Sequence, residues 1–173
     1  MEKGFVHIYY GDGKGKTSAA IGLIVRAVGA GMKVFLARFL KDDNSCELSV
    51  LKTLNGVTLG DCPHELPFWF VMKEEEKQSY RQYATALFKR AQIESSSNDV
   101  VVLDEFLDAV ELGIVDKQKA LDFVASFPKN TELVLTGHSI PDGFEQLAHY
   151  VSFVKAQKHP YQEGVLARRG IEY

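Results

Sequence analysis

The chain has 173 residues, of which 46% are hydrophobic and 25% are charged, and its formal net charge is −3. This composition is that of a globular domain and excludes a disordered or fibrous chain. The small negative charge argues against nucleic acid or an anionic membrane as the main partner. Cys46 and Cys62 lack zinc-site or disulfide-framework spacing, and the first apolar run is too short for a signal peptide, so we expect a cytoplasmic protein.

Short apolar runs alternate with stretches of helical periodicity, which is typical of strands buried on both faces of a parallel sheet. In chain order, the predicted elements are a strand over 5–10, a helix over 17–30 that ends at Gly29 and Gly31, a strand over 33–40, a crossover helix over 45–54, a short strand over 57–59, a helix over 73–95, and strands over 99–103, 132–136 and 151–154. The pattern predicts one α/β domain over residues 1–173, with a doubly wound, mostly parallel sheet and helices on both faces.

A glycine-rich turn, Gly11-Asp12-Gly13-Lys14-Gly15-Lys16-Thr17-Ser18, joins the first predicted strand to the first predicted helix. Glycines let successive backbone N–H groups converge on phosphate oxygens, and the helix offers its positive N-terminal end. We expect Lys16 to reach a phosphate and the Thr17 hydroxyl to ligate Mg²⁺. The standard P-loop pattern has a glycine where this chain has Tyr10. A plain hairpin turn needs no Gly-Lys-Thr before a helix, so the stretch predicts nucleotide binding.

Two adjacent carboxylates, Asp104 and Glu105, follow the apolar run Val100-Val101-Val102-Leu103. They are either solvated residues at the end of a strand or ligands of Mg²⁺. Because the carboxyl ends of parallel strands meet at one edge of a sheet, we expect both near Thr17.

These residues together resemble the ATP:corrinoid adenosyltransferases of the type that carries a compact P-loop domain. The resemblance covers nearly the whole chain and rests on 11–20, Gly22, Arg26, Gly29, 39–41, 68–70, 103–105, 135–137, 158–161, Gly164 and 170–173. A P-loop without its first glycine is a trait of this family. The resemblance implies a P-loop NTPase-like (RecA-like) fold, usually as a homodimer. After 136–137 the family commonly has arginine, whereas this chain has His138.

The resemblance also implies a reaction, in which the 5′-deoxyadenosyl group of ATP passes to the Co(I) of a reduced corrinoid and triphosphate leaves. This is an activity of the cob(I)yrinic acid a,c-diamide adenosyltransferase type, with a reduced flavoprotein or free reduced flavin as electron donor. Arg26 and Lys41 look like the family's additional basic contacts to ATP. The segment Phe68-Trp69-Phe70 resembles the part that closes over the corrin and removes the lower ligand from cobalt. The two ring positions of the family map either to Phe68 and Phe70 or to Trp69 alone.

Displacement of triphosphate needs stabilisation of negative charge, which Lys16, the loop amides and Mg²⁺ held by Thr17, Asp104 and Glu105 supply. No general base is required, because the nucleophile is the metal of the substrate. Without the resemblance, the apolar stretch 67–72 would be interpreted as a core strand or an oligomer contact.

Two other functions stay open. One is a P-loop phosphotransferase or ATPase, with Arg168 or Arg169 as the arginine finger. The other is a non-catalytic module that binds a nucleotide and a corrinoid.

Overall fold

The computed structural model describes residues 3–173, so the first two residues of the predicted domain lie outside the described part. Six strands form one sheet in the order β3-β2-β4-β5-β1-β6, and all five neighbouring pairs are parallel. The strands are β1 Val6–Tyr10, β2 Val34–Arg38, β3 Val57–Leu59, β4 Val100–Asp104, β5 Glu132–Gly137 and β6 Tyr150–Phe153. The predicted α/β sheet is therefore confirmed.

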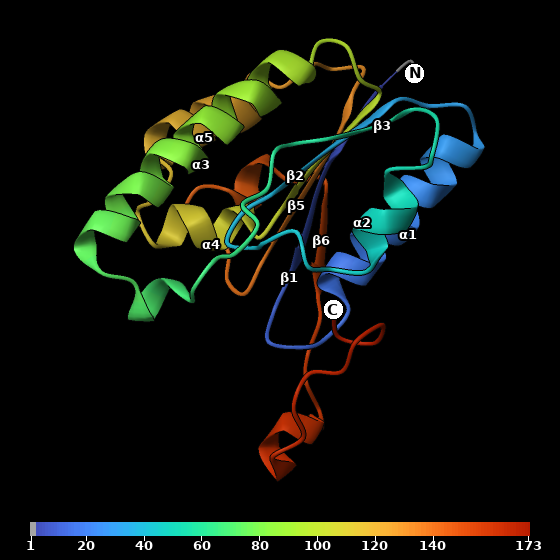
Figure 1. Ribbon diagram of the computed structural model, residues 1–173. Helices are drawn as coiled ribbons and strands as arrows, with labels where there is room; N and C mark the ends of the chain where they lie inside the picture. The colour runs from blue at the N-terminus through green and yellow to red at the C-terminus, as the bar shows by residue number, and fades with distance from the viewer. Residues whose placement is uncertain (1–2) are drawn as a thin grey trace.

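Helices cover both faces of this sheet (Figure 1). The helices are α1 Lys16–Gly29, α2 Glu47–Leu51, α3 Glu74–Glu94, α4 Phe106–Glu111 and α5 Lys117–Ala125, with 3₁₀ turns over Trp69–Val71, Glu145–Leu147 and Pro160–Glu163. Helices α1 and α2 lie on one face, and α3, α4 and α5 lie on the other (Figure 1). The doubly wound arrangement expected from the alternating apolar runs is the one observed.

Strand β2 shows why the run from Val34 to Ala37 is apolar without interruption. Val34 and Leu36 belong to the hydrophobic cluster under α1 and α2, whereas Phe35 and Ala37 belong to the cluster under α3, α4 and α5. Successive side chains of a strand point to opposite faces, so a strand covered on both sides must be apolar at every position. Edge strand β6 is the exception, because all four of its residues are exposed.

The observed bounds differ from the predicted ones by a few residues at most, and Gly31 takes a positive φ of 80° just after α1. Helices α4 and α5, which form the crossover from β4 to β5, were not predicted. Both helices have weak sequence signals. Helix α4 has only six residues, and the start of α5 is marked by its cap residue Asp116, which accepts a hydrogen bond from the Lys119 amide at 2.8 Å. Within residues 3–173, no helix combines the length and apolar character that a bilayer span requires.

Gly137 lies where α4 packs most closely on the sheet. A Cβ atom added at Gly137 would stand 2.7 Å from the Cβ atom of Leu107. We expect Gly137→Ala to lower the free energy of unfolding by about 1–3 kcal/mol through overpacking, as measured by chemical denaturation. Gly22, on α1, is the matched control, because nothing lies within 4 Å of its added Cβ atom.

For Gly22→Ala we expect a gain of about 0.5–1 kcal/mol, because alanine is the better residue inside a helix. Equal effects of the two substitutions would contradict the close approach of α4 to β5.

Candidate functional site

The glycine-rich loop between β1 and α1 folds against the chain that leaves β6. Gly13 donates a backbone hydrogen bond to the carbonyl of Val154 at 2.8 Å. A Cβ atom at Gly11 would lie 2.3 Å from the same carbonyl oxygen, and Gly11 has a φ of 121°. Gly15 also has a positive φ, of 120°, but its added Cβ atom would meet open space. The loop therefore needs glycine for the close approach and for its left-handed turns.

Lys16 fills the centre of this loop. It is only 7% exposed, and its Nζ donates hydrogen bonds to the carbonyl oxygens of Gly11 at 2.6 Å and of Gly13 at 3.1 Å. No side chain in the described part of the protein caps the N-terminus of α1. A buried ammonium group beside the open amides of a helix start is a site for an anion, and phosphate oxygens are stronger acceptors than carbonyls.

Asp104 is the acidic residue that meets the loop. Its side chain is 1% exposed and accepts hydrogen bonds from Thr17 Oγ1 at 3.0 Å, Thr136 Oγ1 at 2.8 Å and Lys41 Nζ at 2.7 Å. These partners come from α1, from β5 and from the chain after β2. The structure thus brings Thr17 and Asp104 together, as the position of both at the carboxyl edge of the sheet predicted.

The ammonium group of Lys41 lies among the residues predicted to hold Mg²⁺. Its Nζ is 2.8 Å from Thr17 Oγ1, 2.7 Å from Asp104 Oδ2 and 3.6 Å from Glu105 Oε1. A cation is therefore already favoured at this point, and the surrounding hydroxyl and carboxylate oxygens are the ligands that Mg²⁺ prefers. The residues present fit Mg²⁺, provided that Lys41 moves away.

The backbone before Lys41 is held from α3. Leu40 has a left-handed φ of 53°, and its amide donates a hydrogen bond to the hydroxyl of Tyr80 at 2.5 Å. Burial raises the pKa of Tyr80 to about 12, so the phenol stays protonated at neutral pH. The Tyr80 ring packs against Trp69 with 6.2 Å between ring centroids. Tyr80 therefore links the aromatic segment to the segment that carries Lys41.

The aromatic segment 68–70 is not a core strand, which corrects one of the two interpretations of this stretch. Trp69 packs on Tyr80, and the cationic groups of Lys77 and Arg81 lie over its ring at 5.5 and 5.1 Å. Phe68 and Phe70 are 85% and 81% exposed. Trp69 is thus anchored to α3, whereas the rings of Phe68 and Phe70 are left in contact with solvent.

A pocket of about 1200 Å³ joins all of these elements. It is lined by the start of α1 at 17–21, by 40–50, by the aromatic segment with its flank at 66–70, by 105–112, by His138 and by 170–173. Phosphate-binding and apolar surfaces therefore face one space, whose volume lies at or above the upper end for small-molecule sites.

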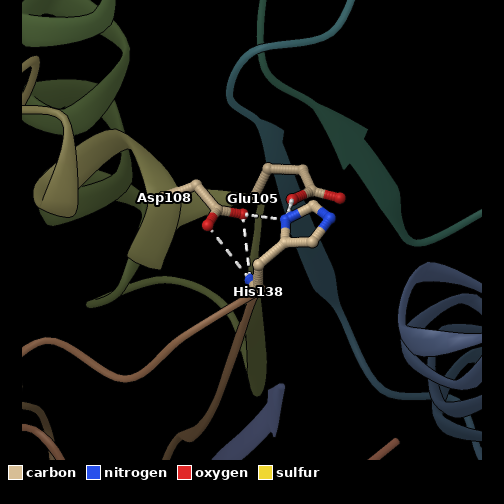
Figure 2. Close-up of side chains that lie close together, drawn as sticks. All are labelled: Glu105, Asp108 and His138. Carbon is tan, nitrogen blue, oxygen red and sulfur yellow. Dashed lines mark hydrogen bonds and ion pairs between the residues drawn. The ribbon is translucent and has the colours of Figure 1, made fainter. Parts of the chain in front are cut away.

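Three titratable residues that line this pocket, Glu105, Asp108 and His138, lie close together (Figure 2). His138 Nδ1 is 2.9 Å from Asp108 Oδ2 and 3.8 Å from Glu105 Oε2. Burial raises the pKa of Glu105 to about 7, and the hydrogen bond to Asp108 raises the pKa of His138. Burial alone would raise the pKa of Asp108, but the hydrogen bonds from His138 outweigh it and keep that pKa low. Asp108 was not predicted, because α4 was not.

Some predicted nucleotide contacts lie apart from the pocket. Arg26 is exposed about 15 Å along α1 from Lys16, given a rise of 1.5 Å per residue. Asp12 is also outside the pocket lining and accepts a hydrogen bond from the Ala156 amide, whereas Ser18 is exposed on the pocket wall. The structure groups Lys16, Thr17, Ser18, Lys41, Asp104 and Glu105, but it does not bring Arg26 to them.

The C-terminal segment closes one side of the site. Glu172 Oε1 is 2.8 Å from Lys14 Nζ in the phosphate loop and 3.0 Å from Arg168 Nη2. These hydrogen bonds, first that from Arg168 and then that from Lys14, hold the pKa of Glu172 below its usual range. In Figure 1 the C-terminus accordingly lies beside the turn between β1 and α1. The family resemblance had marked 170–173 without giving this segment a role.

The sheet order, the phosphate loop with its buried lysine and the acidic residue after β4 define a P-loop nucleotide-binding domain. The chain belongs to the ATP:corrinoid adenosyltransferase BtuR/CobO/CobP family, whose model matches residues 2–173. The resemblance seen in the sequence is thereby confirmed, and so is the class of reaction, transfer of an adenosyl group to a corrinoid.

Two relatives illustrate the extent of this similarity. A corrinoid adenosyltransferase of Pseudomonas aeruginosa is 29% identical over 179 residues, which cover 99% of this chain and 85% of the relative. A corrinoid adenosyltransferase of Escherichia coli strain K12 is 28% identical over 180 residues, which cover 99% and 87%.

The fold has a counterpart among solved structures. The crystal structure of the KaiC-like protein PH0186 from Pyrococcus horikoshii OT3 matches with a TM-score of 0.54 at 13% identity. The match covers 91% of this chain and 75% of the other. This likeness concerns the fold alone and supports the predicted RecA-like, P-loop NTPase-like architecture.

The position of Lys41 generates a stability prediction. In metal-free protein, Lys41→Met should lower the free energy of unfolding by about 1–3 kcal/mol, because buried Asp104 loses its one cationic partner among the described residues. Mg²⁺ should then stabilise Lys41→Met more than the unsubstituted protein, since the ion takes the place that the ammonium left. Thermal and denaturant unfolding with and without Mg²⁺ measure both effects.

Lys117 provides the control, because it forms an exposed ion pair with Asp142 at 3.7 Å. Lys117→Met should change stability little and should not alter the response to Mg²⁺. An equal response to Mg²⁺ in Lys41→Met and in the unsubstituted protein would rule out a shared cation position.

Proposed function

We propose that this protein transfers the 5′-deoxyadenosyl group of ATP to the Co(I) centre of a reduced corrinoid and releases triphosphate. One observation carries the proposal: Thr17 and Ser18, at the end of the phosphate loop, line the same pocket as the exposed rings of Phe68 and Phe70. A phosphotransferase needs the first of these features but has no use for the second. The corrin ring is a large, flat substrate with an apolar surface, for which exposed aromatic side chains are suited.

In the proposed reaction the electron pair of Co(I) forms a bond to the 5′ carbon of ATP. The bond from that carbon to the triphosphate oxygen breaks, and triphosphate leaves with the electron pair. Lys16 and the open amides of α1 are placed to hold the leaving group. When bound, Mg²⁺ would neutralise charge that develops on triphosphate, and Thr17, Asp104 and Glu105 would hold it.

Lys41 has two positions in this proposal. Without nucleotide, its ammonium group pairs with Asp104 and Glu105. With Mg-ATP present, the carboxylates would serve the metal, and Lys41 would turn toward a phosphate oxygen. The side chain is long, flexible and strongly hydrated, so this movement requires no change in the sheet.

The aromatic segment would cover the corrin and keep water from Co(I). Phe68 and Phe70 supply the exposed apolar surface, and Trp69 keeps the segment attached to α3 through Tyr80. The reaction needs no general base, because no proton is transferred. The proposed roles therefore account for the pocket without a nucleophilic side chain.

The two alternative functions lack such support. Arg168, which a phosphotransferase might use as an arginine finger, has its guanidinium group hydrogen-bonded to Glu172. Nothing in the pocket favours a non-catalytic module over an enzyme. The homodimer, the cytoplasmic location, the reduced flavin or flavoprotein donor and the cob(I)yrinic acid a,c-diamide type of substrate stay predictions.

The products decide between adenosyl transfer and phosphotransfer. Anaerobic incubation with Mg-ATP and chemically reduced cob(I)alamin should give a light-sensitive adenosylcobalamin spectrum and inorganic triphosphate in equal amounts. Lys16→Ala should reduce turnover by about 10²-fold or more, because the leaving group loses its buried cation. Formation of ADP and phosphate with an unchanged corrinoid spectrum would overturn the proposal in favour of the phosphotransferase.

Substitutions in the aromatic segment should affect turnover and stability differently. Phe68→Ala and Phe70→Ala should leave thermal stability within about 0.5 kcal/mol, since neither ring is buried, but should lower turnover with the corrinoid. Trp69→Ala should lower stability by about 1–3 kcal/mol as well, because it removes the contact with Tyr80. Calorimetry and the corrinoid assay measure the two effects. Full turnover in Phe68→Ala/Phe70→Ala would show that the rings do not contact the substrate.

A further inference from the structure

We propose that Glu105, Asp108 and His138 form a second divalent-cation site, next to the predicted Mg²⁺ position, that binds a first-row transition metal ion such as Mn²⁺ or Zn²⁺. Within residues 3–173 these are the one group of three His, Cys, Asp or Glu residues whose ligand atoms all lie within 4.8 Å of one another. The proposal concerns the protein without substrates, so it does not rest on the proposed reaction.

The spacing of the three ligand atoms suits one ion. Nδ1 of His138 is 2.9 Å from Asp108 Oδ2 and 3.8 Å from Glu105 Oε2. Ligands bound at about 2.0–2.2 Å in a tetrahedral arrangement are about 3.4 Å apart, and the two distances lie on either side of that value. The third pair, between Asp108 and Glu105, also lies within 4.8 Å, so modest side-chain movements would bring all three atoms to bonding distance.

Glu105 faces two different neighbours with its two oxygens. Oε1 is 3.6 Å from Lys41 Nζ, on the side of Thr17 and Asp104, whereas Oε2 is 3.8 Å from His138 Nδ1. Figure 2 shows that Nδ1 is the ring nitrogen joined by dashed lines to both the Asp108 and the Glu105 carboxylates. The carboxylate of Glu105 therefore stands between the predicted Mg²⁺ position and the second site, where a bridging ligand would stand.

Charge balance at the rim also favours a cation. Asp104, Glu105 and Asp108 place three carboxyl groups within a short stretch of chain, where only Lys41, beside the first two, and His138, beside Asp108, offer positive charge. The side chains of Glu105 and Asp108 are 15% and 16% exposed, so water compensates them incompletely. A cation at their centre would supply the missing positive charge. A polyanion bound in the phosphate loop would make that stabilisation larger.

Backbone contacts hold the ligands in place. The amide of His138 donates to both oxygens of Asp108, at 3.0 and 3.1 Å, and the amide of Glu105 donates to Thr136 Oγ1 at 2.8 Å. Asp108 comes from α4, whereas His138 directly follows β5, and α4 packs on β5 through Gly137. Asp108 thus stands on a helix, and Glu105 and His138 each directly follow a central strand of the sheet.

The imidazole determines the kind of ion. Mg²⁺ is bound through oxygen, whereas an imidazole nitrogen favours transition metals such as Zn²⁺, and carboxylates also suit Mn²⁺. Binding would replace the hydrogen that His138 Nδ1 shares with the carboxylates. The two adjacent positions would therefore differ in selectivity.

The test uses the full chain, freed of metal by a chelator and kept without nucleotide and corrinoid. Mn²⁺ is titrated while free Mn²⁺ is followed by electron paramagnetic resonance, and electron spin echo modulation reports a ¹⁴N nucleus bound to the ion. We expect one ion per chain, ¹⁴N modulation from the imidazole, and displacement of Mn²⁺ by Zn²⁺.

Four variants separate this site from its neighbours. His138→Gln and Asp108→Asn should weaken binding by about tenfold or more, and His138→Gln should abolish the ¹⁴N modulation. Thr17→Val removes a ligand of the predicted Mg²⁺ position but none of the second site, so the ¹⁴N modulation should persist in this variant. His64→Gln is the matched control, because exposed His64 forms a similar pair with Asp43 at 3.0 Å outside the three-residue group.

Absence of ¹⁴N modulation in the unsubstituted protein, or its persistence in His138→Gln, would overturn the proposal. In that case the three residues would form only a hydrogen-bonded ion-pair network. Because the unsubstituted protein alone supplies the decisive spectrum, a variant that fails to fold does not remove the test. Failure of adenosyl transfer would leave this result unaffected, and the two proposals can therefore fail separately.

Discussion

The buried carboxylate of Asp104 is the point on which the site depends. A charge that is 1% exposed is tolerated only when it is paired and hydrogen-bonded, and three side chains from three different elements meet this need. Thr17 brings the start of α1, Thr136 brings β5 and Lys41 brings the chain after β2. The three hydrogen bonds to Asp104 therefore also fix the relative positions of the phosphate loop, the segment that carries Lys41 and the carboxyl edge of the sheet.

This arrangement explains which parts of the molecule could be predicted from the sequence. Strands β2 and β4 each begin with four apolar residues, because helices cover both faces of the sheet, and such short runs between turn residues favour buried strands. The phosphate loop was recognisable because its glycines precede Lys16 and Thr17 at the mouth of a helix. The contact between Thr17 and Asp104 was predictable because the carboxyl ends of parallel strands lie at one edge of the sheet.

Other features depend on contacts that a linear pattern does not record. Helix α4 is too short for a periodic signal, so Asp108 and its approach to His138 were not anticipated. The aromatic segment left two mappings, because three rings in succession have no periodicity. Their separation into an anchored Trp69 and two exposed phenylalanines depends on Tyr80, which is 11 residues away in sequence. Glu172 meets Lys14 across 158 residues, which the resemblance at the C-terminus marked without explaining.

Tyr80 contacts both the aromatic segment and the segment that carries Lys41. Its ring packs on Trp69, and its hydroxyl holds the left-handed backbone of Leu40, the residue before Lys41. A shift of the aromatic segment would reach Lys41 through these two contacts, without passing through the sheet. Binding of one substrate would then change the affinity for the other. Because linkage between binding sites is reciprocal, the factor by which the nucleotide raises corrinoid affinity would equal the factor by which the corrinoid raises nucleotide affinity.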